Sequence, residues 1–149
     1  MANTLLLSTP TTPQVFAAAP IAAVRVDFMR GSPAAVFSEL VGWDETANEF
    51  VAQKEGWYHA QITCEYDEVA DGGSQATSAM ALLVGPTGAW IRQDVQLPAT
   101  FKHFYAGGAI GYLKVGEKIY ADFTNATGSA ITMSGANLLI KFIEQDGPF

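Results

Sequence analysis

The sequence predicts an all-β chain, folded as one antiparallel sandwich or jelly roll. Residues 57–66 alternate strictly between apolar and wetter positions, as in a strand with one face in the core. Further short strand-like segments recur at regular spacing between Gly- and Pro-containing turns, and no stretch has a helical period. With 149 residues, the chain is long enough for one domain with a sizeable core.

The strands are expected in a regular order along the body of the chain. They cover residues 24–28, 35–37, a segment from Phe50, 57–66, 77–84, 89–97, 109–113, 118–124, 130–133 and 136–143. The turn at 85–88 predicts a hairpin between its flanking strands, and the turn at 115–117 predicts a second pair, 109–113 with 118–124. Residues 42–48 and 67–74 are polar or acidic and Gly-containing, so they are expected to be loops.

The last strand is apolar on both faces. Within residues 138–143 only Lys141 is polar. Because one face of a strand in an antiparallel sandwich normally meets water, two apolar faces need two partners. One is the core. The other is a neighbouring subunit or, alternatively, a covering loop.

The N-terminal segment has a different composition. Residues 1–24 carry no charged side chain, and Pro10, Pro13 and Pro20 favour an extended conformation. We therefore divide the chain into an extended arm, residues 1–21, and a body, residues 22–149. The arm is expected to lie on neighbouring protein, although a floppy or self-packed tail is the alternative. Its expected anchors are Leu5, Leu6, Leu7, Val15 and Phe16.

Charge and hydrophobicity limit the kinds of partner. The net charge is −7 and the eight basic residues are scattered, which argues against nucleic acid. No apolar run reaches the roughly 18 residues of a membrane span, and the N-terminus lacks the basic region of a secretory signal. Only 15% of residues are charged and 49% are hydrophobic, a balance that favours self-association.

No catalytic or metal-binding constellation is evident, so we expect neither an enzyme nor a cofactor. His59 and His103 are isolated, and Gly107–Gly111 leads into a strand rather than a phosphate-binding helix. The acidic residues Glu65, Asp67, Glu68 and Asp71 fit no calcium-loop motif and are better explained as a solvated loop. Trp43, Trp57 and Trp90 could line a sugar site, but burial in the core or an interface is favoured. Cys64, the single cysteine, falls on the apolar face of its strand and should be buried and inert.

Three segments resemble the C1q and tumour-necrosis-factor (TNF)-like jelly-roll superfamily. Phe50, Gly56 and Tyr58 match its F-x5-G-x-Y pattern, residues 113–120 resemble its L-x-x-G-D-x-V-[WY] stretch, and residues 134–140 are similar to its closing S-x-F-S-G-F-L segment. Two departures are Glu117 in place of Asp and the missing Phe before Gly135. The resemblance covers about residues 22–143 in the family's order.

This resemblance implies a compact homotrimer. Its inner sheets and rim aromatics would pack around the threefold axis, with Trp57, His59, Leu139 and Ile143 at the trimer interface. Such domains serve many unrelated roles, so the fold alone does not give the function.

The function that these observations favour is a structural virion protein. We expect a homotrimeric capsid decoration, or cement, protein, made in the host cytoplasm and located on the capsid surface. Its arm would bind the major capsid protein or another virion protein. The alternative is the receptor- or glycan-binding head of a phage tail fibre or adhesin, with residues 71–76 and 98–109 as its binding loops.

Overall fold

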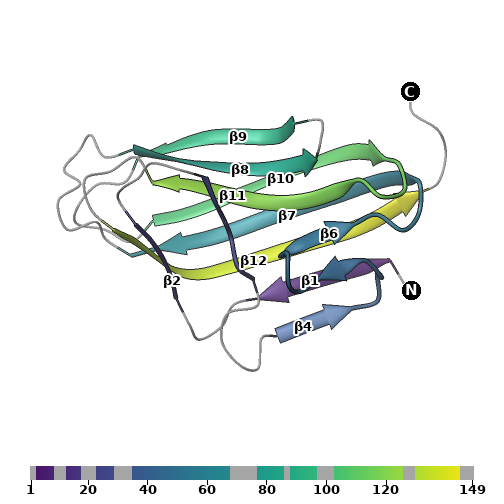
Figure 1. The fold of residues 1–149 in the computed structure, drawn as a ribbon, viewed down its shortest axis with the longest axis horizontal. Coiled ribbons are helices and arrows are strands. Elements are labelled where there is room, and N and C mark those ends of the chain that lie inside the picture. Colours follow the sequence, from purple (N-terminus) through teal and green to yellow (C-terminus); the bar gives the residue numbers. More distant parts are fainter. Residues whose placement is uncertain are drawn as a thin grey trace.

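All secondary structure in the described part of the chain is β-strand. The computed structural model describes residues 3–8, 13–17, 23–28, 35–67, 77–85, 88–96, 103–125 and 130–144. The strands form two sheets in two layers (Figure 1). Within each sheet, every pair of hydrogen-bonded strands is antiparallel. The expected all-β antiparallel jelly roll is confirmed.

Each sheet has one long strand to which two short strands pair along the same edge. Sheet A runs β10 (His103–Leu113), β7 (Gly56–Tyr66), β12 (Ile131–Glu144), β1 (Thr4–Ser8) and β4 (Ala35–Ser38), and β2 (Gln14–Phe16) also pairs with β12. Sheet B runs β5 (Trp43–Asp44), β6 (Glu49–Val51), β11 (Lys118–Asn125), β8 (Thr77–Gly85) and β9 (Gly88–Gln96), and β3 (Ala23–Arg25) also pairs with β11.

The core lies between the two sheets and is rich in aromatic side chains. Phe123 of sheet B packs against both Phe16 and Tyr66 of sheet A, with ring centroids 4.7 and 5.2 Å away. Phe50 and Tyr58 form a similar contact at 5.7 Å. The period-2 prediction for residues 57–66 is confirmed, because Tyr58, Ala60, Ile62, Cys64 and Tyr66 are all buried on the core side of β7.

The described strands of the N-terminal segment belong to this sandwich. β1 lies between β12 and β4, with Leu5 opposite Ile140 and Leu7 opposite Leu138. Leu5 and Leu7 are fully buried in the core, and Phe16 is 1% exposed. The expected division into an arm, residues 1–21, and a separate body, residues 22–149, is therefore wrong for β1 and β2. Burying Leu5, Leu7 and Phe16 against the chain's own second sheet leaves them unable to anchor a neighbour.

Two side-chain amides fasten β2 to sheet B. The Gln14 side chain donates from Nε2 to the Arg25 carbonyl (3.0 Å) and accepts from the Asp27 amide at Oε1 (2.8 Å). Asn125, which is buried at the end of β11, donates from Nδ2 to the Phe16 carbonyl at 2.9 Å. These bonds satisfy backbone groups between the layers, where leaving them unpaired would be costly.

Two details of the predicted strand order need correction. Residues 109–113 and 118–124 do not pair, since β10 is in sheet A and β11 in sheet B. The turn between them hydrogen-bonds to Ala52 instead. The Gly116 amide donates to the Ala52 carbonyl, and the Ala52 amide donates to the Glu117 carbonyl. The two strands predicted at 130–133 and 136–143 are one strand, β12, which begins at Ile131 and has a register shift between Met133 and Gly135. The predicted β8–β9 hairpin is confirmed.

Candidate functional site

The outer face of sheet A is the candidate site, because large apolar side chains gather there without cover from the other residues that the structure describes. Strand alternation turns Trp57, His59 and Gln61 of β7 away from the core. The register places His59 between Ile110 of β10 and Lys141 of β12, and Gln61 between Gly108 and Leu139. Leu6 of β1 continues the second row beside Leu139.

Several of these apolar side chains are strongly exposed. Ile110 is 63% exposed, Ile143 45% and Leu6 40%, while Leu139 is half-buried. Exposed apolar residues that are scattered singly need no explanation, but a contiguous group on one sheet face marks an interaction surface. The outer face of sheet B differs along β3, β6 and β11, where it carries charged side chains.

Those charged side chains are paired with one another. Arg25 contacts Glu49 (3.2 Å) and Asp122 (2.8 Å), and its guanidinium lies 3.7 Å from the centre of the Tyr120 ring. Lys118 contacts the other Glu49 oxygen at 2.7 Å. This network joins β3 to β6 across the edge of β11, so we assign it a structural role. It also keeps this face of sheet B polar and compatible with water.

An aromatic pair stands at one end of the outer face of sheet A. Trp57 and Tyr112 are cross-strand partners whose rings meet edge to face at 5.6 Å and 74°. The pKa of the Tyr112 hydroxyl is raised, first by partial loss of water and then by the Glu55 carboxylate. Edge-to-face pairs are stabilised by about 0.5–1.5 kcal/mol beyond their buried area, so this pair holds two rigid rings at the rim of the face.

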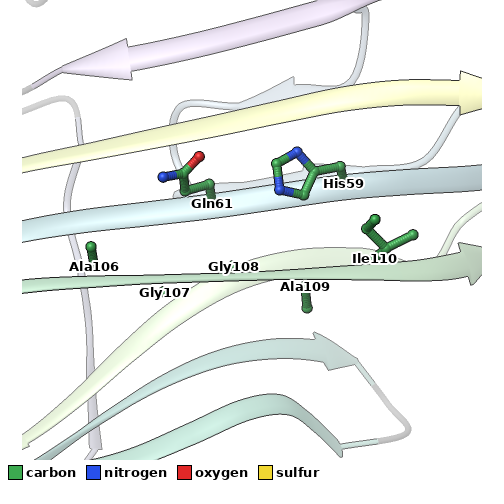
Figure 2. Close-up of a pocket in the computed structure, with 7 residues that line it drawn as sticks. All are labelled: His59, Gln61, Ala106, Gly107, Gly108, Ala109 and Ile110. Atoms are coloured by element: carbon green, nitrogen blue, oxygen red, sulfur yellow. The ribbon is translucent and has the colours of Figure 1, made fainter.

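Beside the aromatic pair, the face is hollowed between β7 and β10. The hollow has a volume of about 640 Å³ and is lined by His59, Gln61 and residues 106–110. Figure 2 shows His59 and Gln61 along β7 and Ala106 and Ile110 along β10, with Gly107 and Gly108 between them. The floor is low because these glycines and alanines have little or no side chain. A Cβ at Gly108 would lie 3.1 Å from the Ala60 carbonyl oxygen and 3.4 Å from His59 Nε2, so the imidazole borders the floor at contact distance.

The residues expected at a trimer interface share this one face. Trp57 and His59 project from β7, and Leu139 and Ile143 from β12, all on the outer side of sheet A. The expected arm anchors do not stay together: Leu5, Leu7 and Phe16 are in the core, whereas Leu6 and Val15 are exposed. Sequence reasoning placed Gln61 on the same side of its strand as Trp57 and His59, but it missed Ile110, Tyr112 and Gly108 as members of the face. The alternation of Ile110 and Tyr112 within the predicted strand 109–113 could have indicated the first two.

The described residues do not form the other sites considered from the sequence, such as a metal site or a sugar site lined by tryptophans. Within the described ranges, no three His, Cys, Asp or Glu side chains come together as a metal site, and no helix could cross a membrane. Glu68, Asp71 and the side chain of Trp90 lie outside what the structure describes. Trp43 is partly buried against the core, edge to face with Phe28. Cys64 is buried as expected, and burial raises the pKa of its thiol to about 12.

Comparison with solved structures gives the fold a name. The globular domain of zebrafish complement 1qA protein superposes with a TM-score of 0.64 at 11% identity, covering 97% of this chain and 99% of the other. The chain has the C1q/TNF-like jelly-roll fold. Eiger TNF from S. frugiperda superposes with a TM-score of 0.59 at 12% identity, covering 98% and 95%.

The C1q/TNF-like fold includes the N-terminal strands, since both superpositions span nearly the whole chain. No protein-family model and no curated protein matches the sequence. Identities this low show the fold alone, and the function must be argued from the surface.

Proposed function

We propose that this chain is a structural, non-catalytic protein that works as a homotrimer, with the outer face of sheet A packed around the threefold axis. The observation that carries the proposal is the contrast between the two outer faces. Sheet A exposes Leu6, Ile110 and Ile143, whereas sheet B presents ion-paired side chains along β3, β6 and β11.

The free energy of association would come from apolar burial. Covering a large apolar side chain is favourable by about 1.5–3 kcal/mol, before the cost of ordering the subunits. A trimer covers three copies of the outer face of sheet A at once, together with the rims formed by Trp57 and Tyr112. Lys141, the one Lys or Arg side chain on the described part of that face, can keep its ammonium group at the edge in water while its stem packs.

Sedimentation velocity of the intact chain tests the trimer. We expect a species of three times the chain mass of 15.9 kDa at micromolar concentration. A monomer under those conditions would contradict the proposal.

The finer assignment, a decoration protein on a viral capsid, is also part of this proposal and is supported by the sequence. An acidic chain of low charge content suits a stoichiometric role in a particle. Contact with the shell would not use the proposed arm, because Leu5, Leu7 and Phe16 are buried in the chain's own core. The test is quantitative mass spectrometry of purified virions of the virus that encodes the chain. A stoichiometric copy number is expected, and absence from the virion would count against the assignment.

One observation favours the alternative, a receptor- or glycan-binding head. The hollow places the polar His59 and Gln61 side chains beside the Trp57–Tyr112 pair, and sugars bind to such combinations of polar groups and aromatic rings. A glycan array probed with the intact chain distinguishes the two functions. Binding that Trp57→Ala abolishes would support the alternative, and no binding on the array would favour the structural role.

A further inference from the structure

We propose that the hollow between β7 and β10 is a socket for a second copy of this chain, filled by the apolar ridge that Leu6 and Leu139 form on the neighbouring subunit. This inference rests on the proposed trimer and adds which two surfaces meet. The structure supports it through the different shapes of the two halves of one face.

The socket half is concave and floored with small residues. Ala106 and Gly108 of β10 project little or nothing above the sheet, while His59 and Gln61 stand along one side and Ile110 closes one end (Figure 2). Among the residues of this face whose exposure the structure describes, Ile110 is the most exposed large apolar side chain. The small residues of the floor and Ile110 leave a gap that an apolar side chain can fill, and an unfilled gap forfeits packing contacts.

The ridge half carries two large apolar side chains. Leu6 and Leu139 are directly paired across β1 and β12, and both side chains point outward. Backbone pairing on both sides of each strand holds the ridge rigid, because β1 lies between β12 and β4 and β12 lies between β1 and β7. A rigid pair of leucines loses little conformational entropy on docking.

Symmetry requires two different surfaces to meet. In a cyclic trimer each interface is heterologous, so one patch of a subunit contacts a different patch of the next. A face that is hollow on one half and ridged on the other satisfies that condition with a single sheet. The halves also carry opposite charges, with exposed Glu65 on β7 of the socket half and exposed Lys141 on β12 of the ridge half.

Cysteine cross-linking tests the contact directly. In the double variant Ala106→Cys/Leu139→Cys, the two thiols of one chain cannot join, because β7 separates β10 from β12 by about 10 Å, beyond the roughly 7 Å that a disulfide allows. With copper phenanthroline as the oxidant of the two thiols, we expect a covalent trimer on a non-reducing gel. The native Cys64 is buried, and burial holds its pKa near 12, so it should stay unreacted.

The single variants separate this inference from the trimer itself. Ala106→Cys alone and Leu139→Cys alone should give no covalent species; a covalent dimer of Leu139→Cys would indicate ridge-on-ridge contact and overturn the socket. If the reduced double variant sediments as a trimer but does not cross-link, the socket is wrong and the trimer stands. If no trimer forms at any stage, both proposals fail.

Filling the socket gives a second measurement. Ala106→Leu places a larger side chain on the exposed floor and should weaken association about tenfold or more, as overpacked contacts do. Ala23→Leu, at an exposed position on β3 of sheet B, is the matched control and should leave association unchanged. Unchanged association of Ala106→Leu, with a native circular dichroism spectrum, would contradict the socket.

Discussion

Leu6 on β1 lies directly opposite Leu139 on β12, and both side chains point out of the sandwich rather than into it. Their neighbours Leu5 and Ile140 are also paired, but fully buried in the core. Each strand is thus apolar on both faces for a definite reason. The inner face fills this chain's own core, and the outer face is available to another copy.

The first prediction contrasts the two faces of β1. Leu5→Ala should lower the free energy of unfolding by about 2–5 kcal/mol, because it opens a cavity in the core. Leu6→Ala should change the unfolding of the monomer by less than about 1 kcal/mol and weaken association instead. Urea unfolding, at a protein concentration low enough to keep the chain monomeric, measures the free energy of unfolding of both variants. Equal effects of the two substitutions would contradict the placement of β1.

Removing the N-terminal segment should damage the fold itself. A chain lacking residues 1–21 loses β1 and β2, and with them the fully buried Leu5 and Leu7 and the almost fully buried Phe16. It also exposes one edge of β12, a template for aggregation. We expect loss of cooperative unfolding in circular dichroism and a larger soluble aggregate by light scattering. A truncated chain that is as stable as the intact one would show that the segment is a dispensable arm.

Gln14 provides a narrower test of how β2 is held. Gln14→Ala removes two hydrogen bonds to the backbone of Arg25 and Asp27 and should cost about 1–3 kcal/mol of unfolding free energy. Gln53→Ala is the matched control, since Gln53 is exposed and its side-chain amide donates to the carbonyl of Val51, two residues away. If both variants unfold at the same urea concentration, the amide of Gln14 does not fasten the two sheets.

The buried acidic groups predict loss of stability at alkaline pH. Burial raises the pKa of Cys64 from 9.0 to about 12 and also raises that of Tyr58 above 10.0. The folded state therefore holds these protons more tightly than the unfolded state does. Their contribution to stability is complete below about pH 9 and is lost as the pH rises toward the folded values.

The measurement is the urea midpoint from about pH 7 to about pH 11, with a reductant present. In Cys64→Ala the midpoint should fall less steeply above pH 9 than in the parent chain, although its value at neutral pH is lower because of the cavity. Identical pH slopes for the two proteins would contradict a buried Cys64 thiol.

Local patterns in the sequence predicted the elements whose partners are near in the chain or whose faces differ sharply. The alternation from Tyr58 to Tyr66 gave the correct core face, and the turn at 85–88 gave the hairpin. The pairing of β1 with β12 was missed because it joins positions that are 129 to 137 residues apart, from Ser8 with Asn137 to Thr4 with Lys141, and no local pattern reports such a pairing. One signal was present: residues 5–7 and 138–140 are both runs that are apolar on two faces, and they pair with each other.

The candidate site was only partly predictable for a related reason. Leu139 and Ile143 could be identified from a strand with two apolar faces, and His59 from its wetter face. Gly108 and Ala106 gave no such signal, because a residue with little side chain has no preferred face. The hollow arises only when the register sets them beside His59 and Gln61.

The most direct test of the central claim, that the outer face of sheet A is where copies of this chain meet, compares two matched charge substitutions. Ile110 lies on that face and is 63% exposed, whereas Val115 lies in the turn after β10 and is 65% exposed. Sedimentation velocity at micromolar concentration should show Ile110→Glu as a monomer and Val115→Glu as a trimer like the parent chain. A trimer for Ile110→Glu, or a monomer for the parent chain, would contradict the claim.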